Sequence, residues 1–389
     1  MDKKIVFLDG ARTPFGKFGG GIKDLTAIEL GAHAAKEAVK RSKVNPEEIG
    51  HVVFGNALQT SPDAIYLARH VGLRSELPLQ TPAVTVNRLC GSGFQAIVDG
   101  AKHLLMDEAI FVLAGGTESM SQAPHVIWGA RWGISLGKGK LVDLLWDALY
   151  DPVAGCSMAI TAENLAEKYK ITRKEADEFA FRSQQLAKSA IEKGKLKEEI
   201  SPIQSGKKSI SQDEHPRFDT TLEGLAQLNP YFKEGGTVTA GNASGICDGA
   251  AALVLSTEET ARKRNLPILG KLLGWGYAGV DPKYMGIGPV EASKSALKKV
   301  NLSLKEIDLI EVNEAFSPQY LAVEKELGLN REKVNVNGGA IALGHPLGAS
   351  GARLTLTLLY ELRRSGKKYG LAAACIGGGQ GITLIVESC

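Results

Sequence analysis

Long apolar segments are missing from this sequence. The longest unbroken apolar stretches, such as Ala250–Leu255 and Leu371–Ile376, are far shorter than the ~20 residues of a membrane-spanning helix. Residues Met1–Leu8 run directly into a predicted strand at Ile5–Leu8, without an apolar or Arg/Ser-rich leader. We therefore expect no membrane association and a cytoplasmic location, or the mitochondrial matrix if the chain is eukaryotic.

A large excess of charge of either sign is also missing. Lys and Arg total 46 and Asp and Glu total 43, which leaves a formal net charge of +3. Proteins that bind nucleic acid carry clustered basic residues, and this sequence has no such cluster. The charge pattern therefore predicts no nucleic-acid partner.

Cysteine is scarce and scattered. The five cysteines form no C-x-x-C pair; they are Cys90, Cys156, Cys247, Cys375 and Cys389. An odd number at this spacing argues against a disulfide framework and against a structural metal site. We expect free thiols in a reducing compartment, so the question is which of them is reactive.

Glycine patterns that hold nucleotides are absent as well. The runs at Gly19–Gly21 and Gly377–Gly381 match neither the dinucleotide-binding nor the Walker spacing. Nicotinamide chemistry and nucleotide hydrolysis are therefore poor candidates.

An internal repeat is the main organising feature that is present. Asn45–Asn56 is a polar turn followed by a β-branched strand that ends in Asn, and Ser303–Asn313 repeats this pattern. Amphipathic helices are predicted before both, at Ala27–Lys40 and Val290–Val300. The chain therefore contains two related halves.

A second correspondence follows each repeat: a strand, a glycine-rich turn, a helix and another strand. In the first half these are Thr81–Val86, Cys90-Gly-Ser-Gly, a helix to about Met106, and Ile110–Ala114. In the second half they are Val334–Val336, Asn337-Gly-Gly to His345-Pro-Leu-Gly, a helix over about Ser350–Arg364, and Leu371–Ile376. Alternating strands and helices predict an α/β fold built of βαβ units.

A segment of different character separates the halves, at roughly Ser119–Ile246. One clear helix is predicted in it, at Arg173–Lys193, and the rest is predicted as irregular loop. Long loops in compact enzymes usually cover a site or form an interface. We predict an N-terminal half at 1–118 plus 247–268, a loop domain at 119–246, and a C-terminal half at 269–389.

Cys90 is the leading candidate nucleophile. It lies between a predicted strand end and a predicted helix start, so its sulfur and several free backbone N–H groups face one volume. A helix N-terminus lowers a thiol pKa and offers donors to an oxyanion. The alternative is a buried structural cysteine at a tight turn.

His345 occupies the position in the second half that Cys90 occupies in the first. If the halves pack about a pseudo-twofold axis, the two residues meet, and a His beside a Cys suits general-base activation of the thiol.

Cys375 and Asn313 each end a predicted strand and are weaker candidates. Cys375 lies in an apolar strand where a cysteine is commonly structural, but the glycine run after it brings backbone close to a ligand. A thiol is well matched in pKa for proton exchange with a thiol substrate. Asn313 orients a water or donates to an oxyanion, or only caps the following segment.

Several long motifs resemble those of the thiolase family over almost the whole chain. They include Asp9–Gly16, Asn87–Phe94, Gly115–Met120, Thr237–Gly245, Val312–Phe316, Asn337–Arg353 and Cys375–Gly381. Within the family the chain looks most like the mitochondrial-type 3-ketoacyl-CoA thiolases. The resemblance implies a thiolase fold, two βαβ-type halves with the loop domain inserted in the first, and an acyltransferase of fatty acid metabolism and β-oxidation.

The resemblance also implies roles for the candidate residues. Cys90 is acylated in a ping-pong reaction, His345 takes its proton, and Cys375 is the second acid/base. Asn313, through a water, and His345 form one oxyanion hole, and the N–H groups of Cys90 and Gly377 form the other. Cleavage and its reverse, a Claisen condensation, use the same groups.

Coenzyme A and acetyl-CoA enter as substrates, with no permanently bound cofactor and no metal. The implied coenzyme A contacts are Arg217 and Ser244, with Met158 and Phe316 along the pantetheine tunnel. The chain departs from the acetoacetyl-CoA-type pattern at Ser157–Ile160 and at Gly224, which favours the broader ketoacyl type. A homodimer or homotetramer is implied, with the loop domain in the contacts.

Three alternatives stand beside this interpretation. One is an acetoacetyl-CoA-specific, biosynthetic acetyl-CoA C-acetyltransferase. Another is a decarboxylating condensing enzyme, which uses a second His where this chain has Asn313. The most distant is a non-catalytic acyl-CoA-binding relative, against which the joint presence of the four catalytic candidates argues.

Overall fold

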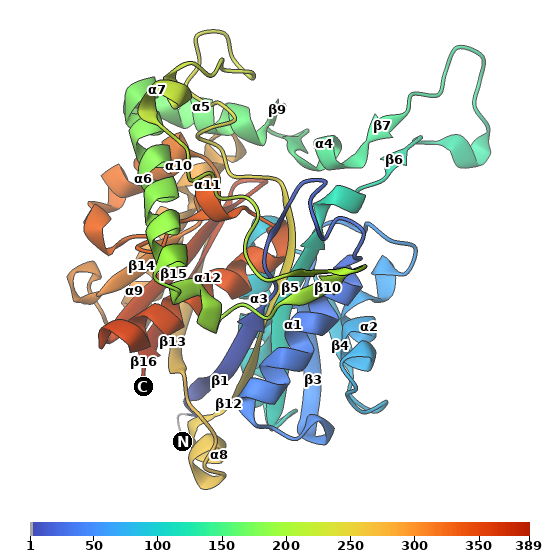
Figure 1. Cartoon of the computed structure of the whole chain (residues 1–389), viewed down its shortest axis with the longest axis vertical. Coiled ribbons are helices and arrows are strands. Elements are labelled where there is room, and N and C mark those ends of the chain that lie inside the picture. The colour runs from blue at the N-terminus through green and yellow to red at the C-terminus, as the bar shows by residue number, and fades with distance from the viewer. Residues whose placement is uncertain (1–2) are drawn as a thin grey trace.

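One mixed sheet runs through both halves of the chain (Figure 1). The computed structural model describes residues 3–389; Met1 and Asp2, with which the predicted N-terminal half begins, lie outside the described residues. From one edge to the other, the strand order is β4-β3-β5-β12-β1-β13-β16-β15-β14. The first-half strands are β1 (Ile5–Arg12), β3 (Ile49–Gly55), β4 (Ala83–Val86), β5 (Phe111–Ser119) and β12 (Cys247–Thr257), with β2 (Gly16–Lys17) beside β12. The second-half strands are β13 (Gly270–Gly279), β14 (Leu309–Val312), β15 (Tyr369–Ile376) and β16 (Gln380–Ser388).

The strand order confirms the predicted repeat. In each half, parallel strands lie at the outer edge, β3 with β4 and β5 in the first and β14 with β15 in the second. The equivalent strands β1 and β13 meet in the middle and pair antiparallel, with Ile5 opposite Leu272. Antiparallel pairing of equivalent strands is what a twofold relation between the halves produces.

Helices cover both outer faces of the sheet and fill the space between the halves. In the first half these are α1 (Ala27–Ser42), α2 (Leu67–Arg74), α3 (Ser92–Leu105) and α8 (Glu258–Lys263). In the second half they are α9 (Gly288–Val300), α10 (Ser317–Leu327), α11 (Ala340–Leu343) and α12 (Leu347–Ser365). None of the helices over residues 3–389 is long and apolar enough to cross a membrane.

Local signals account for where the main helices begin and end. Thr26 accepts a hydrogen bond from the Glu29 N–H, and Glu29 returns one to the Thr26 N–H, so this capping box starts α1. Helix α12 ends at Gly366, whose φ of 64° is the left-handed conformation that glycine adopts at little cost.

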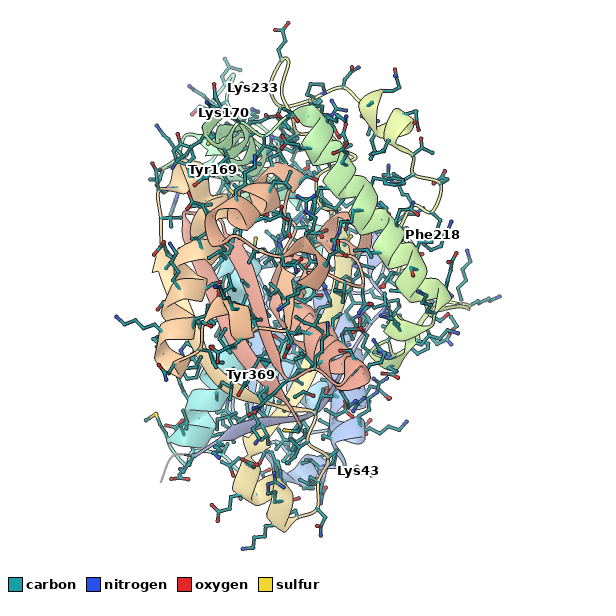
Figure 2. The ribbon with its side chains drawn as sticks, turned by 90° about the vertical axis from the view of Figure 1, so that its left-hand side faces the viewer. Lys43, Tyr169, Lys170, Phe218, Lys233 and Tyr369 are labelled. Atoms are coloured by element: carbon teal, nitrogen blue, oxygen red, sulfur yellow. The ribbon has the colours of Figure 1, made fainter. Side chains whose placement is uncertain are left out.

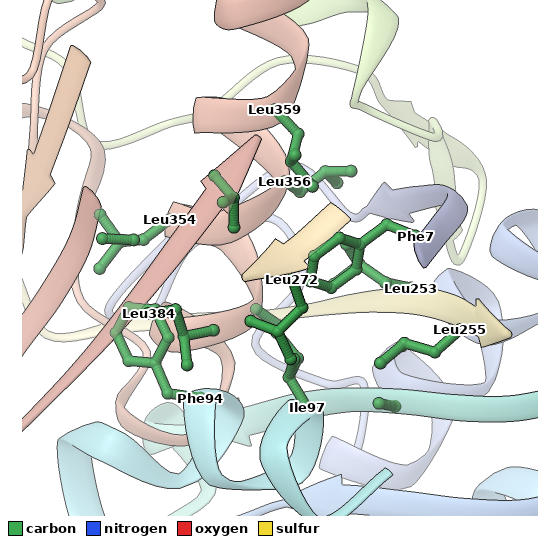
Figure 3. Packing of buried hydrophobic residues seen from close by; sticks show 14 of the residues in the cluster. Phe7, Phe94, Ile97, Leu253, Leu255, Leu272, Leu354, Leu356, Leu359 and Leu384 are labelled. Carbon is green, nitrogen blue, oxygen red and sulfur yellow. The ribbon is translucent and has the colours of Figure 1, made fainter. Parts of the chain in front are cut away.

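The largest apolar cluster lies between the halves. Figure 3 shows Phe94 and Ile97 of α3 packing with leucines of α12, including Leu354, and with residues of β12, β13 and β16. Separate apolar clusters lie under α1 and α2 and under α9 and α10. The strands of the two halves therefore lie on either side of α3 and α12. The five layers are α1 with α2, the first-half strands, α3 with α12, the second-half strands, and α9 with α10.

The two central helices cross so closely that only glycine fits at the contact. A Cβ on Gly93 would lie 2.6 Å from the Ala352 nitrogen, and one on Gly351 would lie 2.2 Å from the Phe94 nitrogen. These neighbours are backbone atoms and cannot rotate away. The crossing therefore sets the position of α3 relative to α12, and with it the position of both helix starts.

Two sequence predictions about secondary structure are wrong in part. The predicted strand at Val334–Val336 is reduced to a single bridge between Val334 and Ile310, because the chain turns away through Asn335 at a φ of 47°. The segment between the halves is more ordered than predicted. Its helix α6 (Arg173–Glu192) is confirmed, but α4 (Leu144–Ala148), α5 (Met158–Tyr169) and α7 (Leu222–Ala226) are additional.

Short strand pairs complete this segment. They are β6 (His125–Val126) with β7 (Val142–Asp143), β8 (Tyr150–Asp151) with β9 (Cys156–Ser157), and β10 (Ile203–Ser205) with β11 (Lys208–Ile210). Figure 1 shows that the chain between β6 and β7 projects away from the body as an arm. Helix α6 lies along the second half instead, packed by Phe179 against Tyr320 of α10, with ring centroids 4.1 Å apart.

We expect Gly93→Ala to destabilise the protein, because the added methyl group overlaps fixed backbone and overpacking typically costs about 1–3 kcal/mol. The midpoint of thermal unfolding, compared at one scan rate, should fall by several degrees. The control is Gly279→Ala, whose added Cβ meets no atom within 4 Å. Equal midpoints for the two variants would show that the crossing tolerates a side chain.

Candidate active site

The ends of α3 and α12 bring residues from both halves to one place. Cys90 lies in a short 3-10 turn, two residues before α3, and His345 likewise lies two residues before α12. Cys90 packs in an apolar cluster with Leu347, the first residue of α12. The starts of the two central helices therefore lie close together, and the crossing of these helices is the cause.

The turn that presents Cys90 is held in an unusual backbone conformation. Leu89 has a φ of 46°, a left-handed value that is costly for a leucine. The Asn87 side chain accepts from the Leu89 N–H at 2.9 Å, and the Ser92 hydroxyl accepts from the Arg88 N–H at 2.8 Å. These hydrogen bonds hold the turn in this conformation and so fix the position of Cys90.

Burial controls the ionisation of the Cys90 thiol. It raises the pKa of Cys90 to about 11, and the negative charge of Glu118 adds to the increase. The backbone N–H groups of Gly377 and of Cys90 itself act in the opposite direction. The sequence-based expectation of a lowered thiol pKa is therefore wrong in sign, since desolvation outweighs the donors at the helix start.

His345 is held neutral in the same environment. Burial, with a smaller contribution from the positive charge of Arg353, lowers its pKa to about 3. Its Nε2 lies 3.3 Å from Asn313 Nδ2, and its Nδ1 lies 2.6 Å from the Ser350 hydroxyl. The ground state of the pair is thus a neutral thiol and a neutral imidazole, and a thiolate forms only as its proton is transferred.

Asn313 and Cys375 come from the second-half strands. Asn313 directly follows β14, and its backbone N–H donates to the Ala373 carbonyl of β15 at 2.9 Å. Its buried Oδ1 has no hydrogen-bond partner among the described residues. Cys375 is fully buried in β15, and burial, with repulsion from Cys90 whenever that residue is ionised, holds its pKa well above the usual value.

Gly377 lies close to Cys90 in a tightly packed turn. A Cβ added to it would lie 3.1 Å from Leu89 Cδ1 and 3.3 Å from Met158 Sδ. Its N–H acts on the Cys90 sulfur, so Gly377 and Cys90 offer two backbone donors to the same volume. Such paired donors stabilise an oxyanion on an acyl group attached to the sulfur.

A cavity of about 770 Å³ leads from the surface to His345. All of the predicted coenzyme A residues line it together with His345: Met158, Arg217, Ser244 and Phe316. The volume lies within the range of ligand and cofactor pockets. Apolar side chains predominate along the walls and include the aromatic rings of Trp146 and Phe232.

The mouth of the cavity carries a cation that the sequence reasoning missed. Lys17 of β2 lines the cavity with Arg217, and both also line an adjoining hollow of about 520 Å³. Figure 2 shows Phe218, the residue after Arg217, at the surface near α6. The position of Lys17 depends on the pairing of β2 with β12, which no local pattern reveals.

The two departures noted in the sequence fall at or near this cavity. Ser157 lines it, while its hydroxyl accepts from the Ile160 N–H and starts α5. Gly224 lies in α7 beside a smaller hollow of about 220 Å³ that it shares with Arg217.

Glu118 is a buried carboxylate near Cys90 that the sequence reasoning did not single out. Its carboxylate accepts from the N–H groups of Ala57, Leu58 and Gly348 and from the Asn56 side chain, at 2.8–3.0 Å. Burial raises the pKa of Glu118 to about 7 in spite of these donors. It therefore ties a first-half loop to the first turn of α12, close enough to Cys90 for its charge to act on the thiol.

Comparison with known proteins agrees with the fold. The chain matches the sequence profiles of the thiolase N-terminal domain over residues 5–259 and the thiolase C-terminal domain over residues 266–388. It is 55% identical over 382 residues to human mitochondrial 3-ketoacyl-CoA thiolase, covering 97% of this chain and 96% of that protein. It is 47% identical over 392 residues to beta-ketothiolase BktB of Cupriavidus necator, covering all of both chains.

Solved structures show the same relationship. The crystal structure of human mitochondrial 3-ketoacyl-CoA thiolase superposes with a TM-score of 0.98 at 54% identity, covering 99% of each chain. The Bacillus anthracis acetyl-CoA acetyltransferase superposes with a TM-score of 0.97 at 46% identity, covering 100% of this chain and 99% of that one.

These matches define an acyltransferase, and they confirm the predicted fold and class of enzyme. The chain belongs to the thiolase family.

The raised thiol pKa makes a direct prediction for alkylation of Cys90. Because the thiolate is the reactive form, the iodoacetamide rate at Cys90 should rise about tenfold per pH unit from pH 7 and level off only near pH 11. Site-resolved mass spectrometry separates Cys90 from the exposed Cys389, which serves as the internal control. A plateau near neutral pH would mean that Cys90 is a preformed thiolate.

Proposed function

We propose that this thiolase cleaves 3-ketoacyl-CoA with coenzyme A to acetyl-CoA and a shortened acyl-CoA, and catalyses the reverse Claisen condensation. One observation carries the proposal: a cavity of about 770 Å³ reaches His345, which contacts the Asn313 amide, and Cys90 with the Gly377 N–H lies close by, packed with Leu347 of the same cavity wall. The names of the relatives support the substrate class, and a structure of the human enzyme in complex with coenzyme A supports the ligand.

The first half-reaction begins with attack by Cys90 on the substrate C3 carbonyl. His345 Nε2 accepts the thiol proton as the S–C bond forms. The bond between C2 and C3 then breaks, and its electrons pass into the enolate of acetyl-CoA. Protonated His345 stabilises that enolate, together with a water held by the free Oδ1 of Asn313. Cys375 then protonates the enolate carbon. Acetyl-CoA leaves, and the shortened acyl group stays on Cys90.

The second half-reaction transfers the acyl group to coenzyme A. Cys375, now deprotonated, accepts the proton of the incoming thiol, whose sulfur attacks the thioester carbonyl. The N–H groups of Cys90 and Gly377 stabilise the oxyanion, and the Cys90 sulfur leaves with a proton returned by His345. Because an acyl-enzyme separates the two steps, the kinetics are ping-pong.

Coenzyme A fits the cavity with its phosphates at the charged mouth. Arg217 binds there, with Ser244 further in, and Met158 and Phe316 contact the pantetheine chain. The proposed domains are an N-terminal half at 1–118 plus 247–268, a loop domain at 119–246 and a C-terminal half at 269–389. The enzyme works in the cytoplasm, or in the mitochondrial matrix of a eukaryote.

The acyl group trapped on Cys90 tests this proposal. Incubation with 3-ketooctanoyl-CoA in the absence of free coenzyme A should add a hexanoyl group, measured by intact-protein mass spectrometry. Acetoacetyl-CoA should add an acetyl group. Cys90→Ser should remove both additions, because the un-ionised serine hydroxyl is a far poorer nucleophile than the thiol.

The outcomes separate the candidate functions. An adduct from acetoacetyl-CoA alone would identify the acetoacetyl-CoA-specific enzyme. Retained ligand without any adduct would identify a binding protein and contradict the proposal.

A homodimer or homotetramer is the second part of the proposal, with the loop domain in the contacts. The arm between β6 and β7 exposes large apolar side chains: Trp128 at 68%, Trp132 at 88% and Leu136 at 104% of their maximum area. Exposed apolar groups gathered on one projection are typical of a surface that binds a partner.

We expect replacement of Trp132 and Leu136 together by Ser to reduce the oligomer mass, measured by light scattering after gel filtration. The control replaces Ile65 and Leu79, which are comparably exposed at 66% and 75% but lie outside the loop domain. An unchanged mass for the arm variant would exclude the arm from assembly.

A further inference from the structure

The orientation of the His345 proton depends on a serine one turn into α12. His345 Nδ1 lies 2.6 Å from Ser350 Oγ, and Ser350 Oγ lies 2.8 Å from the Pro346 carbonyl oxygen. Ser350 is fully buried and His345 is 5% exposed. The three groups therefore form a chain of short contacts shielded from solvent.

Only one placement of protons makes both contacts hydrogen bonds. A carbonyl oxygen cannot donate, so the contact with Pro346 requires the single Ser350 hydroxyl proton. Ser350 Oγ can then only accept from His345, and Nδ1 must carry a proton. If Ser350 donated to Nδ1 instead, two buried oxygen acceptors would face each other at 2.8 Å.

The contact at the other ring nitrogen is compatible with the same assignment. With Nδ1 protonated in a neutral ring, Nε2 has a free lone pair and requires a donor. Asn313 Nδ2 lies 3.3 Å from it, and Asn313 Oδ1 remains without a partner among the described residues.

We propose that Ser350 is a positioning residue that holds neutral His345 as the Nδ1–H tautomer, with the Nε2 lone pair directed into the catalytic volume. The hydroxyl achieves this because its own proton is committed to the Pro346 carbonyl. Once His345 accepts the Cys90 proton, the same hydroxyl still accepts from Nδ1–H, so the ring does not have to turn between steps. The inference rests on the proposed role of His345 as the base.

The spacing along the chain explains how the serine reaches the ring. Helix α12 begins at Leu347, and its first turn carries Ser350 back over Pro346, to whose carbonyl its own backbone N–H also donates at 3.0 Å. A serine that bonds back to the carbonyl four residues earlier is common in helices. Here that bond leaves the hydroxyl as an acceptor only.

The tautomer itself is the first measurement. Long-range ¹⁵N–¹H spectra of full-length protein labelled at histidine report which ring nitrogen carries the proton, and the His345→Gln variant assigns the signal. At neutral pH the Nδ1–H form is expected in the unmodified protein. An Nε2–H form there would overturn the proposal without any variant.

The Ser350→Ala variant tests whether the serine hydroxyl determines the tautomer of His345. The variant should populate both tautomers of His345 and should lower kcat about tenfold, the size expected when one neutral hydrogen bond is lost, with little change in KM. The matched control is Thr355→Val, because Thr355 is equally buried in α12 and bonds back to the Gly351 carbonyl at 2.8 Å. A similar loss of kcat in both variants, or an unchanged tautomer in Ser350→Ala, would overturn the proposal.

Failure of this inference is distinguishable from failure of the proposed function. If His345→Gln still forms acyl-Cys90 at the original rate, His345 is not the base and the proposed mechanism fails. If His345 is required for acylation but Ser350→Ala keeps the original kcat and tautomer, only the role of Ser350 fails.

Discussion

The site depends on the crossing of α3 and α12 at Gly93 and Gly351. Backbone atoms of each helix occupy the space that a side chain on the other would fill, so the helices cannot slide or rotate past one another independently. The N-terminal ends of both helices point to one volume, and Cys90 and His345 lie at those ends. The layers on either side, through the leucines of α12 and the strands of both halves, keep this contact closed (Figure 3). Packing therefore controls the distance between residues that are far apart in the sequence.

Burial is the second constraint, and it determines the chemistry of the ground state. A solvent-exposed cysteine at a helix start would be a stronger acid than usual, but the Cys90 thiol is desolvated enough for its pKa to rise to about 11. The same environment lowers the pKa of His345 to about 3. Both partners are neutral until substrate arrives, which keeps the nucleophile in its less oxidisable thiol form between turnovers. Backbone donors at Cys90 and Gly377 are then placed to act on charge that develops during the reaction.

The strong local patterns were predicted well from the sequence. The long helices and the repeated strands, including α1, α3, α12 and β15, lie where periodicity placed them, because those segments bury one continuous apolar face. The predictions that failed concern weak or competing signals. Val334–Val336 has strand-forming residues but only one bridge, and α5 was predicted as loop because its apolar face is short and packs on a turn at Pro282–Ile287. The predicted sign of the Cys90 pKa shift was wrong because the thiol becomes buried only when the layers assemble.

The sequence by itself determined the class of enzyme and the candidate residues. The spacing of Cys90 and His345 within two related halves, and the long motifs around them, are present in the linear chain and identify the chemistry. Only the tertiary structure decided which groups face one another and in what state. The contact of His345 with Ser350, the position of Lys17 at the cavity mouth and the cradle of N–H groups around Glu118 arise from packing of distant segments. The physical reason is that proton positions and pKa values depend on neighbours and on exclusion of water, and neither is defined until the layers close.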